Sequence, residues 1–291
     1  MALDDRHWFS EPFGDEGIAF SLKIRRKLHE KQTPFQKIEV FETERWGNLL
    51  VIDGCMMLTS RDNFTYHEMM SHPVLFTHPA PKRVLIIGGG DCGVLQEVLK
   101  HPGVEQCVQV DIDEGVTRAA LQYFPELCTA NDDPRAELRF EDGLQYLKDC
   151  AVGSLDVVIV DSTDPVGPAE GLFGESFLRD VHRALTDDGL LVQQSESPIL
   201  HVDSLIRDLH QAMRGAGFTR LATLQFPVVS YPTGWWSATM ASKGADLTRF
   251  RENDAREADL GTHYYSADMH RAALTAPPFC QHRFTEQLRK R

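Results

Sequence analysis

The chain has 291 residues, of which 42% are hydrophobic and 25% are charged, so it can form one large α/β domain together with a smaller one. Its formal charge of -13 disfavours DNA, RNA and anionic membranes as partners, because those polyanions are bound through an excess of lysine and arginine. No apolar run approaches the roughly 20 residues that span a bilayer, and the acidic N-terminus lacks the apolar core of a secretory signal. We therefore expect a cytoplasmic protein.

The six cysteines are scattered and include no C-x-x-C pair. This spacing argues against a zinc ribbon or a thioredoxin-type site, and a disulfide framework is not expected in a cytosolic chain of this size.

Residues 1–60 are predicted to form a small antiparallel β domain, and residues 61–291 the main domain. Short strands are expected at 18–28, 36–43, 48–53 and 56–59, separated by turn signals such as Asp53-Gly54. Residues 61–77 then change to a helical period, with Asp62 available as the cap and Pro73 expected to end or kink the helix.

From residue 83 onward, apolar strands alternate with helical segments, which predicts a doubly wound, Rossmann-like parallel sheet. The predicted strands are 84–90, 106–111, 136–140, 156–160 and 189–194, followed by an antiparallel pair at 218–226 and 236–242. The predicted helices are 93–100, 114–123, 144–148, 173–185 and 202–215. The tail from about residue 244 carries no clear pattern.

A glycine loop, Gly88 to Gly93, follows the first strand of this sheet and opens a helix, as a nucleotide-binding loop does. Asp91 lies inside the loop, where its carboxylate would repel the pyrophosphate of a dinucleotide. NAD is therefore disfavoured. The alternative role of Asp91 is that of a simple helix cap.

Three further carboxylates follow neighbouring strands. Asp111 stands 21 residues after Gly90, where an acid binds the hydroxyls of an adenosine ribose, and Asp113 is expected to cap the next helix. Asp142, before Gly143, can accept a hydrogen bond from an exocyclic amine such as that of adenine, or can simply shape a turn. Acidic residues thus follow each of the first four strands of the predicted parallel sheet and line one edge of it. This arrangement favours an adenosine ligand that carries no phosphate.

The fourth strand ends in the segment LDVVIVDSTDP, which carries Asp161 and Asp164. Ligands of open α/β sheets bind beyond the carboxyl ends of the strands, so two acids there indicate a ligand that is cationic or must lose a proton. The alternative is a capped loop and a turn before Pro165.

Three other enzyme classes lack their motifs. The segment His67 to His72 places its histidines five residues apart, whereas zinc proteases need H-E-x-x-H with both on one helix face. The sequence also contains no G-x-S-x-G elbow and no G-x-x-x-x-G-K-[ST] loop, so it gives no support to a serine hydrolase or a P-loop enzyme.

The chain resembles the spermidine synthase family of aminopropyltransferases almost throughout its length, from about Trp8 to the C-terminal YYSADMHRAAL. The motifs that carry the resemblance are TPFQKIEVFET (33–43), YHEM (66–69), VLIIGGGDCGVLQEVLKHPGVE (84–105), VDIDEGV (110–116), DDPRAEL (132–138), DG (142–143), DSTDPVGPAEGLF (161–173) and YPTGWWS (231–237). The resemblance implies a methyltransferase-like fold and transfer of an aminopropyl group from decarboxylated S-adenosylmethionine to an amine, usually putrescine. The products are spermidine and 5'-methylthioadenosine, and no prosthetic group or metal is expected.

The same resemblance implies a role for each site residue. Asp161 is expected to be the general base. The residues expected to hold the donor are Gln36, His67, Gly88, Asp91, Asp111, Asp142, Gly143 and Pro168, with His67 at the junction of donor and acceptor. The residues expected to hold the acceptor are Tyr66, Ser162, Thr163, Asp164, Glu196, Tyr231 and Trp236. Asp91 would bind the ammonium that decarboxylation leaves at the end of the donor and would oppose the carboxylate of intact S-adenosylmethionine.

Two positions depart from the family pattern. Cys92 stands where glycine is usual, and Asp111 where glutamate is commoner. The shorter Asp111 side chain is expected to shift the ribose slightly.

Several alternatives remain open at this point. A methyltransferase would share the fold, a polyamine-binding protein would share the acids, and the acceptor could be cadaverine, agmatine or spermidine. By resemblance we also expect a homodimer or homotetramer, and a mobile loop over the site around Leu172 and Phe173.

Overall fold

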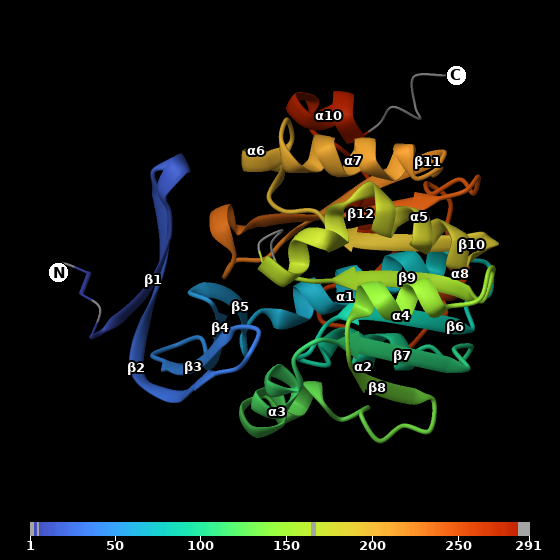
Figure 1. Ribbon diagram of the computed structural model, residues 1–291. Coiled ribbons are helices and arrows are strands. Elements are labelled where there is room, and N and C mark those ends of the chain that lie inside the picture. The colour runs from blue at the N-terminus through green and yellow to red at the C-terminus, as the bar shows by residue number, and fades with distance from the viewer. Residues whose placement is uncertain (1–2, 5, 164–166, 285–291) are drawn as a thin grey trace.

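The computed structural model describes residues 3–4, 6–163 and 167–284, and it contains two sheets (Figure 1). Asp164, expected to anchor the acceptor, lies outside the described residues. In the described part of the chain, no helix is both long and apolar enough to cross a membrane.

The first sheet is an antiparallel meander whose strands pair in chain order. Its strands are β1 (Trp8–Phe13), β2 (Ile18–Gln32), β3 (Lys37–Thr43), β4 (Asn48–Ile52) and β5 (Cys55–Thr59). The sequence did not predict β1, which contains Pro12; the strand tolerates this proline because it is the edge of the sheet. The β1–β2 hairpin projects away from the larger sheet (Figure 1).

The second sheet has seven strands in the order β11-β12-β10-β9-β6-β7-β8, and β12 is the one strand of the seven that runs opposite to the others. Its strands are β6 (Arg83–Gly88), β7 (Gln106–Asp111), β8 (Ala136–Phe140), β9 (Leu155–Asp161), β10 (Leu185–Gln194), β11 (Arg220–Pro227) and β12 (Trp235–Ser242). This order confirms the predicted doubly wound sheet of the methyltransferase-like type, including the antiparallel pair at its end.

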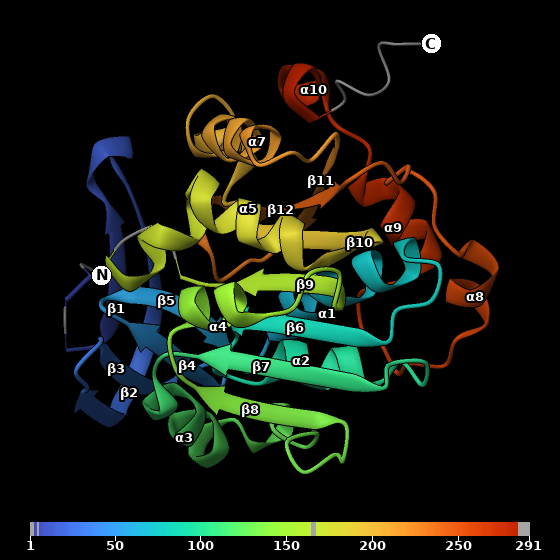
Figure 2. The same cartoon turned by 45° about the vertical axis from the view of Figure 1, so that its right-hand side comes forward.

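Helices cover both faces of the larger sheet (Figure 2). Along β9, Val157 and Ile159 face one apolar cluster while Val158 and Val160 face the other, which explains why these four consecutive residues are all apolar. The helices are α1 (Asn63–Thr77), α2 (Gly93–Leu99), α3 (Glu114–Tyr123), α4 (Gly143–Asp149), α5 (Glu175–Ala184), α6 (Pro198–His201), α7 (Leu205–Gly215), α8 (Glu252–Glu257), α9 (Ala267–Ala273) and α10 (Pro278–Phe284).

Helix α1 differs from its prediction in two ways. It does not end at Pro73 but continues to Thr77, because nearly all of its side chains are buried and packing outweighs one missing backbone hydrogen bond. Asp62 occupies the cap position without capping; its carboxylate accepts hydrogen bonds from the Thr59 hydroxyl (2.6 Å) and the Ser230 N–H (2.8 Å).

The C-terminal tail is ordered into α8, α9 and α10, which the sequence did not predict. The buried Glu68 of α1 fixes the tail, because its carboxylate accepts hydrogen bonds from the N–H groups of His263 (2.7 Å), Tyr264 (2.9 Å) and Tyr265 (2.6 Å). Glu68 is thus a structural residue of the YHEM motif.

Candidate active site

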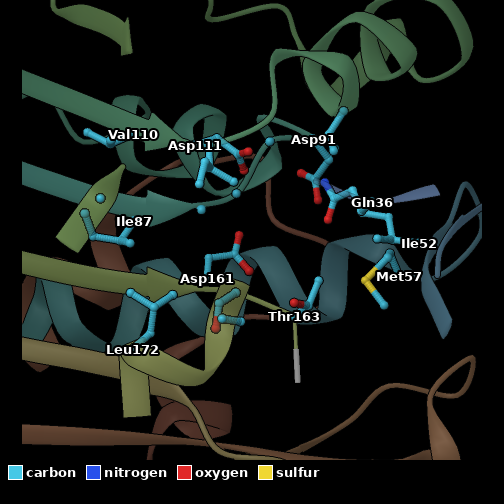
Figure 3. Close-up of a pocket in the computed structure, with 18 of the residues that line it drawn as sticks. Gln36, Ile52, Met57, Ile87, Asp91, Val110, Asp111, Asp161, Thr163 and Leu172 are labelled. Atoms are coloured by element: carbon cyan, nitrogen blue, oxygen red, sulfur yellow. The ribbon is translucent and has the colours of Figure 1, made fainter. Parts of the chain in front are cut away.

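A cavity of about 310 Å³ opens at the carboxyl ends of β6, β7 and β9, between the two sheets (Figure 3). Its volume falls within the range of ligand sites, roughly 300 to 1,000 Å³. The carboxylates of Asp91, Asp111 and Asp161 converge on it. The predicted site residues that line it are Gln36, Tyr66, Gly88, Asp91, Asp111, Asp142, Gly143, Asp161, Ser162, Thr163 and Tyr231.

The glycine loop is pressed against the end of β9. Gly88 has a φ of +83°, and a Cβ atom added there would lie 2.0 Å from the Asp161 carbonyl oxygen. The N–H of Gly89 donates to that same oxygen at 2.8 Å. Glycine is therefore required at position 88 for close approach as well as for its backbone conformation.

Gly88→Ala is expected to lower the free energy of unfolding by about 3 kcal/mol, since both backbone strain and a steric clash are introduced. Urea denaturation measures this loss. Gly54→Ala is the matched control, because Gly54 has a similar φ of +88° but no atom within 4 Å of an added Cβ. Equal losses in the two variants would contradict a role for close packing at Gly88.

Asp91 is held by two partners at the start of α2. Its Oδ1 accepts a hydrogen bond from the Gly93 N–H at 2.7 Å and lies 3.3 Å from Nε2 of the buried His67. Burial raises the pKa of Asp91, but the charge and hydrogen bond of His67 outweigh it, so the pKa lies below its ordinary value. Conversely, Asp91 raises the pKa of His67 despite burial. Asp91 therefore binds the first N–H of α2 from the position before the N-cap residue, Cys92, and also presents a negative charge to the cavity.

His67 does not line the cavity itself. It lies behind Asp91 and so close to α2 that a Cβ atom at Gly93 would lie 2.2 Å from its ring. The role of His67 at the junction of donor and acceptor stays a prediction; in the structure its nearest charged partner is Asp91.

Asp111 and Gln36 both line the larger cavity and are both connected to Asp113. The Asp111 Oδ1 accepts from the Asp113 N–H (2.8 Å), and burial raises the pKa of Asp111 to about 6. Asp113 caps α3 as predicted, by accepting from the Gly115 N–H (2.9 Å). Its other oxygen accepts from Gln36 Nε2 (3.1 Å) and the Thr33 hydroxyl (2.7 Å), which fixes Gln36 at the cavity.

Asp142 and Gly143 lie where β8 turns into α4. The Asp142 Oδ1 caps this helix by accepting from the Leu144 N–H at 2.8 Å, so the turn role is present. Both residues also line the cavity. A Cβ atom at Gly143 would lie 2.9 Å from the Ile87 side chain, which explains why glycine occupies this position.

Asp161 ends β9 at the centre of the site. Its Oδ1 accepts a hydrogen bond from the Tyr66 hydroxyl at 2.6 Å, and its buried Oδ2 has no partner among the described residues. Burial, together with the charge of Asp91, raises the pKa of Asp161 to about 7 against the lowering effect of the Tyr66 hydrogen bond. A buried carboxylate with one open oxygen and this pKa is suited to accept a proton near neutral pH.

A second cavity of about 40 Å³ adjoins the first and shares its walls at Tyr66, Ser162, Thr163 and Tyr231. Trp236 lines the small cavity but not the larger one, and its ring centre lies 4.7 Å from that of Tyr231. The small cavity is thus an aromatic slot that opens beside Asp161.

The lining residues of the small cavity that were not predicted include two with an amide or carboxylate side chain, Glu11 of β1 and Gln194 of β10. The Glu11 carboxylate accepts from the Met56 N–H at 2.8 Å. Glu196 is buried but lines neither cavity; it accepts from Gln194 Nε2 at 3.3 Å and has a φ of +66°. The side chain of Pro168 lies outside the described residues.

Within residues 3–4, 6–163 and 167–284, no three histidine, cysteine or acidic side chains are grouped to hold a metal ion. The two histidines of the His67 to His72 segment contact different carboxylates. His67 contacts Asp91, and His72 Nε2 lies 3.1 Å from Glu97.

The sheet order and the position of the cavity define a methyltransferase-like protein whose cavity is lined by several aspartates. The family model for the spermine/spermidine synthase domain matches residues 63–251, and the spermidine synthase tetramerisation domain matches residues 7–60. The chain therefore belongs to the spermidine synthase family, and it is an aminopropyltransferase.

The alignments with similar proteins cover nearly the whole chain. It is 67% identical to the polyamine aminopropyltransferase of Alkalilimnicola ehrlichii, over 99% of this chain and 100% of the other. A spermidine synthase solved in complex with the transition state analogue AdoDATO superposes with a TM-score of 0.91 at 34% identity, over 97% of this chain and 96% of the other. The spermidine synthase of Thermotoga maritima has a TM-score of 0.89 at 34% identity, over 95% and 94%.

Proposed function

We propose that the protein transfers the aminopropyl group of decarboxylated S-adenosylmethionine to putrescine in the cytoplasm, giving spermidine and 5'-methylthioadenosine. The observation that carries the donor assignment is Asp91, an ionised carboxylate that lines the cavity from inside the glycine loop. An ammonium is attracted there, whereas a phosphate, or the carboxylate of intact S-adenosylmethionine, is repelled.

The larger cavity supplies the remaining donor contacts in this proposal. Gln36 and Asp111 hold the ribose hydroxyls, and Asp142, Gly143 and Pro168 hold adenine. All four described residues line the cavity: Gln36 precedes β3, Asp111 ends β7, and Asp142 and Gly143 follow β8.

The smaller cavity supplies the acceptor contacts. Tyr66, Tyr231 and Trp236 form walls for the methylene chain, and Ser162 and Thr163 border it. Glu196 and Asp164 are proposed to attract the distal ammonium. Glu196 would act through Gln194, to which it is hydrogen-bonded.

In the proposed reaction, Asp161 accepts a proton from the attacking amine. The amine nitrogen then forms a bond to the carbon next to the sulfonium, and the carbon–sulfur bond breaks with its electron pair moving to sulfur. The sulfur leaves neutral, so the leaving group needs no acid, and the charge moves to the product amine. The ring of carboxylates offsets the repulsion between two bound cations.

The reaction is expected to slow as the pH falls through about 7, because protonated Asp161 cannot accept a proton. Tyr66→Phe removes a hydrogen bond that lowers the pKa of Asp161, so the acid limb of the kcat/KM profile is expected to move up by roughly half a pH unit or more. The pH profiles of the variant and of the unsubstituted protein are measured with the same substrates, so the titration of the amine affects both equally. An unmoved limb would show that Asp161 does not set it.

The preferred acceptor is tested by kcat/KM for amines of different lengths and charges. Putrescine is expected to exceed cadaverine, agmatine and spermidine by about tenfold or more, since one misplaced methylene or charge costs about 1 to 3 kcal/mol in a closed slot. A preference for any of the other three would contradict the choice of putrescine while leaving aminopropyl transfer intact.

We also propose a homodimer or homotetramer assembled through the N-terminal sheet. One face of this sheet packs on α3, and the other carries a second apolar cluster, formed by residues such as Phe9, Phe20 and Phe41. Sedimentation equilibrium at several concentrations would detect the assembly, and a monomer would contradict it.

The mobility of the segment around Leu172 and Phe173 remains a prediction. Leu172 lines the larger cavity.

A further inference from the structure

Two free cysteines meet directly behind the glycine loop. Cys92 follows Asp91 and begins α2 with a φ of +70°, and Cys128 follows the short helical turn Pro125–Leu127. Both side chains are buried in one small cluster, where Cys128 lowers the pKa of Cys92 and Cys92 raises the pKa of Cys128. No other pair of cysteines among the described residues shares a cluster in this way.

Each thiol also contacts the backbone of the glycine loop. Cys128 Sγ donates to the carbonyl oxygen of Asp91 at 3.7 Å, and Cys92 Sγ donates to that of Gly90 at 3.7 Å. Any change in these sulfur atoms is therefore transmitted to the residue that faces the proposed donor ammonium.

The polar groups around Cys92 favour its thiolate form over the thiol. Hydrogen bonds from Cys128, Asn131 and Gln109 lower the pKa of Cys92 against the effect of burial, whereas burial raises the pKa of Cys107. Gln109 Nε2 lies 3.7 Å from Cys92 Sγ. The buried Gln109 Oε1 and Asn131 Oδ1 have no hydrogen-bond partner among the described residues, so they are available to accept from the hydroxyl of a sulfenic acid.

We propose that Cys92 and Cys128 form an oxidation site, at which hydrogen peroxide produces a disulfide that weakens donor binding. The Cys92 thiolate attacks one peroxide oxygen, the O–O bond breaks, and the hydroxide released takes up a proton to become water. Cys128 then attacks the sulfenic sulfur as its own proton leaves, and a second water is expelled. Two thiols lose two electrons and peroxide gains them, so a dithiol reverses the reaction.

The disulfide is expected to disturb the loop because it requires a sulfur–sulfur distance of about 2.05 Å, much shorter than a thiol hydrogen bond. It also removes both S–H donors, which leaves the Asp91 and Gly90 carbonyl oxygens without these contacts. The predicted effect on the donor depends on the proposed function, since it takes the donor to bind at Asp91.

The test treats the reduced full-length protein with hydrogen peroxide, maps its peptides by mass, and measures the KM for decarboxylated S-adenosylmethionine. A Cys92–Cys128 cross-link is expected, with a donor KM that rises about tenfold and returns after dithiothreitol. Absence of the cross-link in folded protein, or a cross-link that leaves the donor KM unchanged, would overturn the proposal.

Two variants separate this site from general oxidation damage. Cys128→Ser keeps a hydroxyl near the Asp91 carbonyl and is expected to lose the sensitivity of the donor KM to peroxide. Cys150→Ser, at a half-buried cysteine outside the cluster, is expected to retain it. Equal sensitivity in Cys128→Ser would contradict the disulfide. Because the peptide map needs no activity, an inactive reduced enzyme would count against the proposed function and not against the oxidation site.

Discussion

Replacing Asp161 with asparagine is expected to lower kcat by about 10³-fold while changing donor affinity by less than about threefold. The amide has nearly the same shape, and it can still accept a hydrogen bond from the Tyr66 hydroxyl, which lies 2.6 Å from Oδ1. It cannot accept the proton of the attacking amine. Steady-state kinetics and calorimetric titration of the donor measure the two effects separately.

Asp187→Asn is the matched control, because it removes an exposed acid at the start of β10, away from the carboxyl ends of the strands. It is expected to leave kcat and donor affinity as they are. Turnover of Asp161→Asn within tenfold of the unsubstituted protein would remove Asp161 from the role of base. A large loss of donor affinity would make it a binding residue instead.

Asp91→Asn is expected to lower kcat/KM for decarboxylated S-adenosylmethionine by about 30-fold to more than 10³-fold. Truncating one partner of a buried, hydrogen-bonded charge pair costs roughly 2 to 5 kcal/mol, and here it also leaves the buried His67 without its counter-charge. The same change removes the repulsion of a carboxylate, so the preference over intact S-adenosylmethionine is expected to shrink.

Binding of both donors to Asp91→Asn, measured by calorimetry, checks this prediction. Thermal unfolding of the variant must be followed in parallel, since Asp91 also binds the first N–H of α2, that of Gly93. Unchanged discrimination between the two donors in a folded variant would contradict the role assigned to Asp91.

The larger sheet could be predicted from the sequence because its strands carry strong local signals. Val157 to Val160 are all apolar and β-branched, which is typical of a strand that is buried on both faces of a sheet. The exceptions are set by tertiary contacts. Pro73 lies within α1 because the helix is buried, and the tail is ordered because three of its N–H groups bind Glu68 across nearly 200 positions of the chain.

The acids of the site were predictable for a similar reason. Asp91, Asp111, Asp142 and Asp161 each follow a strand, and the topology brings strand ends to one edge. Glu11 and Gln194 carry no such local signal, because long-range packing places them beside the smaller cavity. The position of His67 behind Asp91, which depends on the packing of α1 against α2, is equally invisible in the sequence.

The central claim is that this site selects a donor with an ammonium and transfers its aminopropyl group. It is tested most directly by incubating the purified protein with putrescine and either decarboxylated or intact S-adenosylmethionine, and identifying the products by mass. We expect spermidine and 5'-methylthioadenosine from the decarboxylated donor and no turnover of the intact one. A methylated amine together with S-adenosylhomocysteine would contradict it.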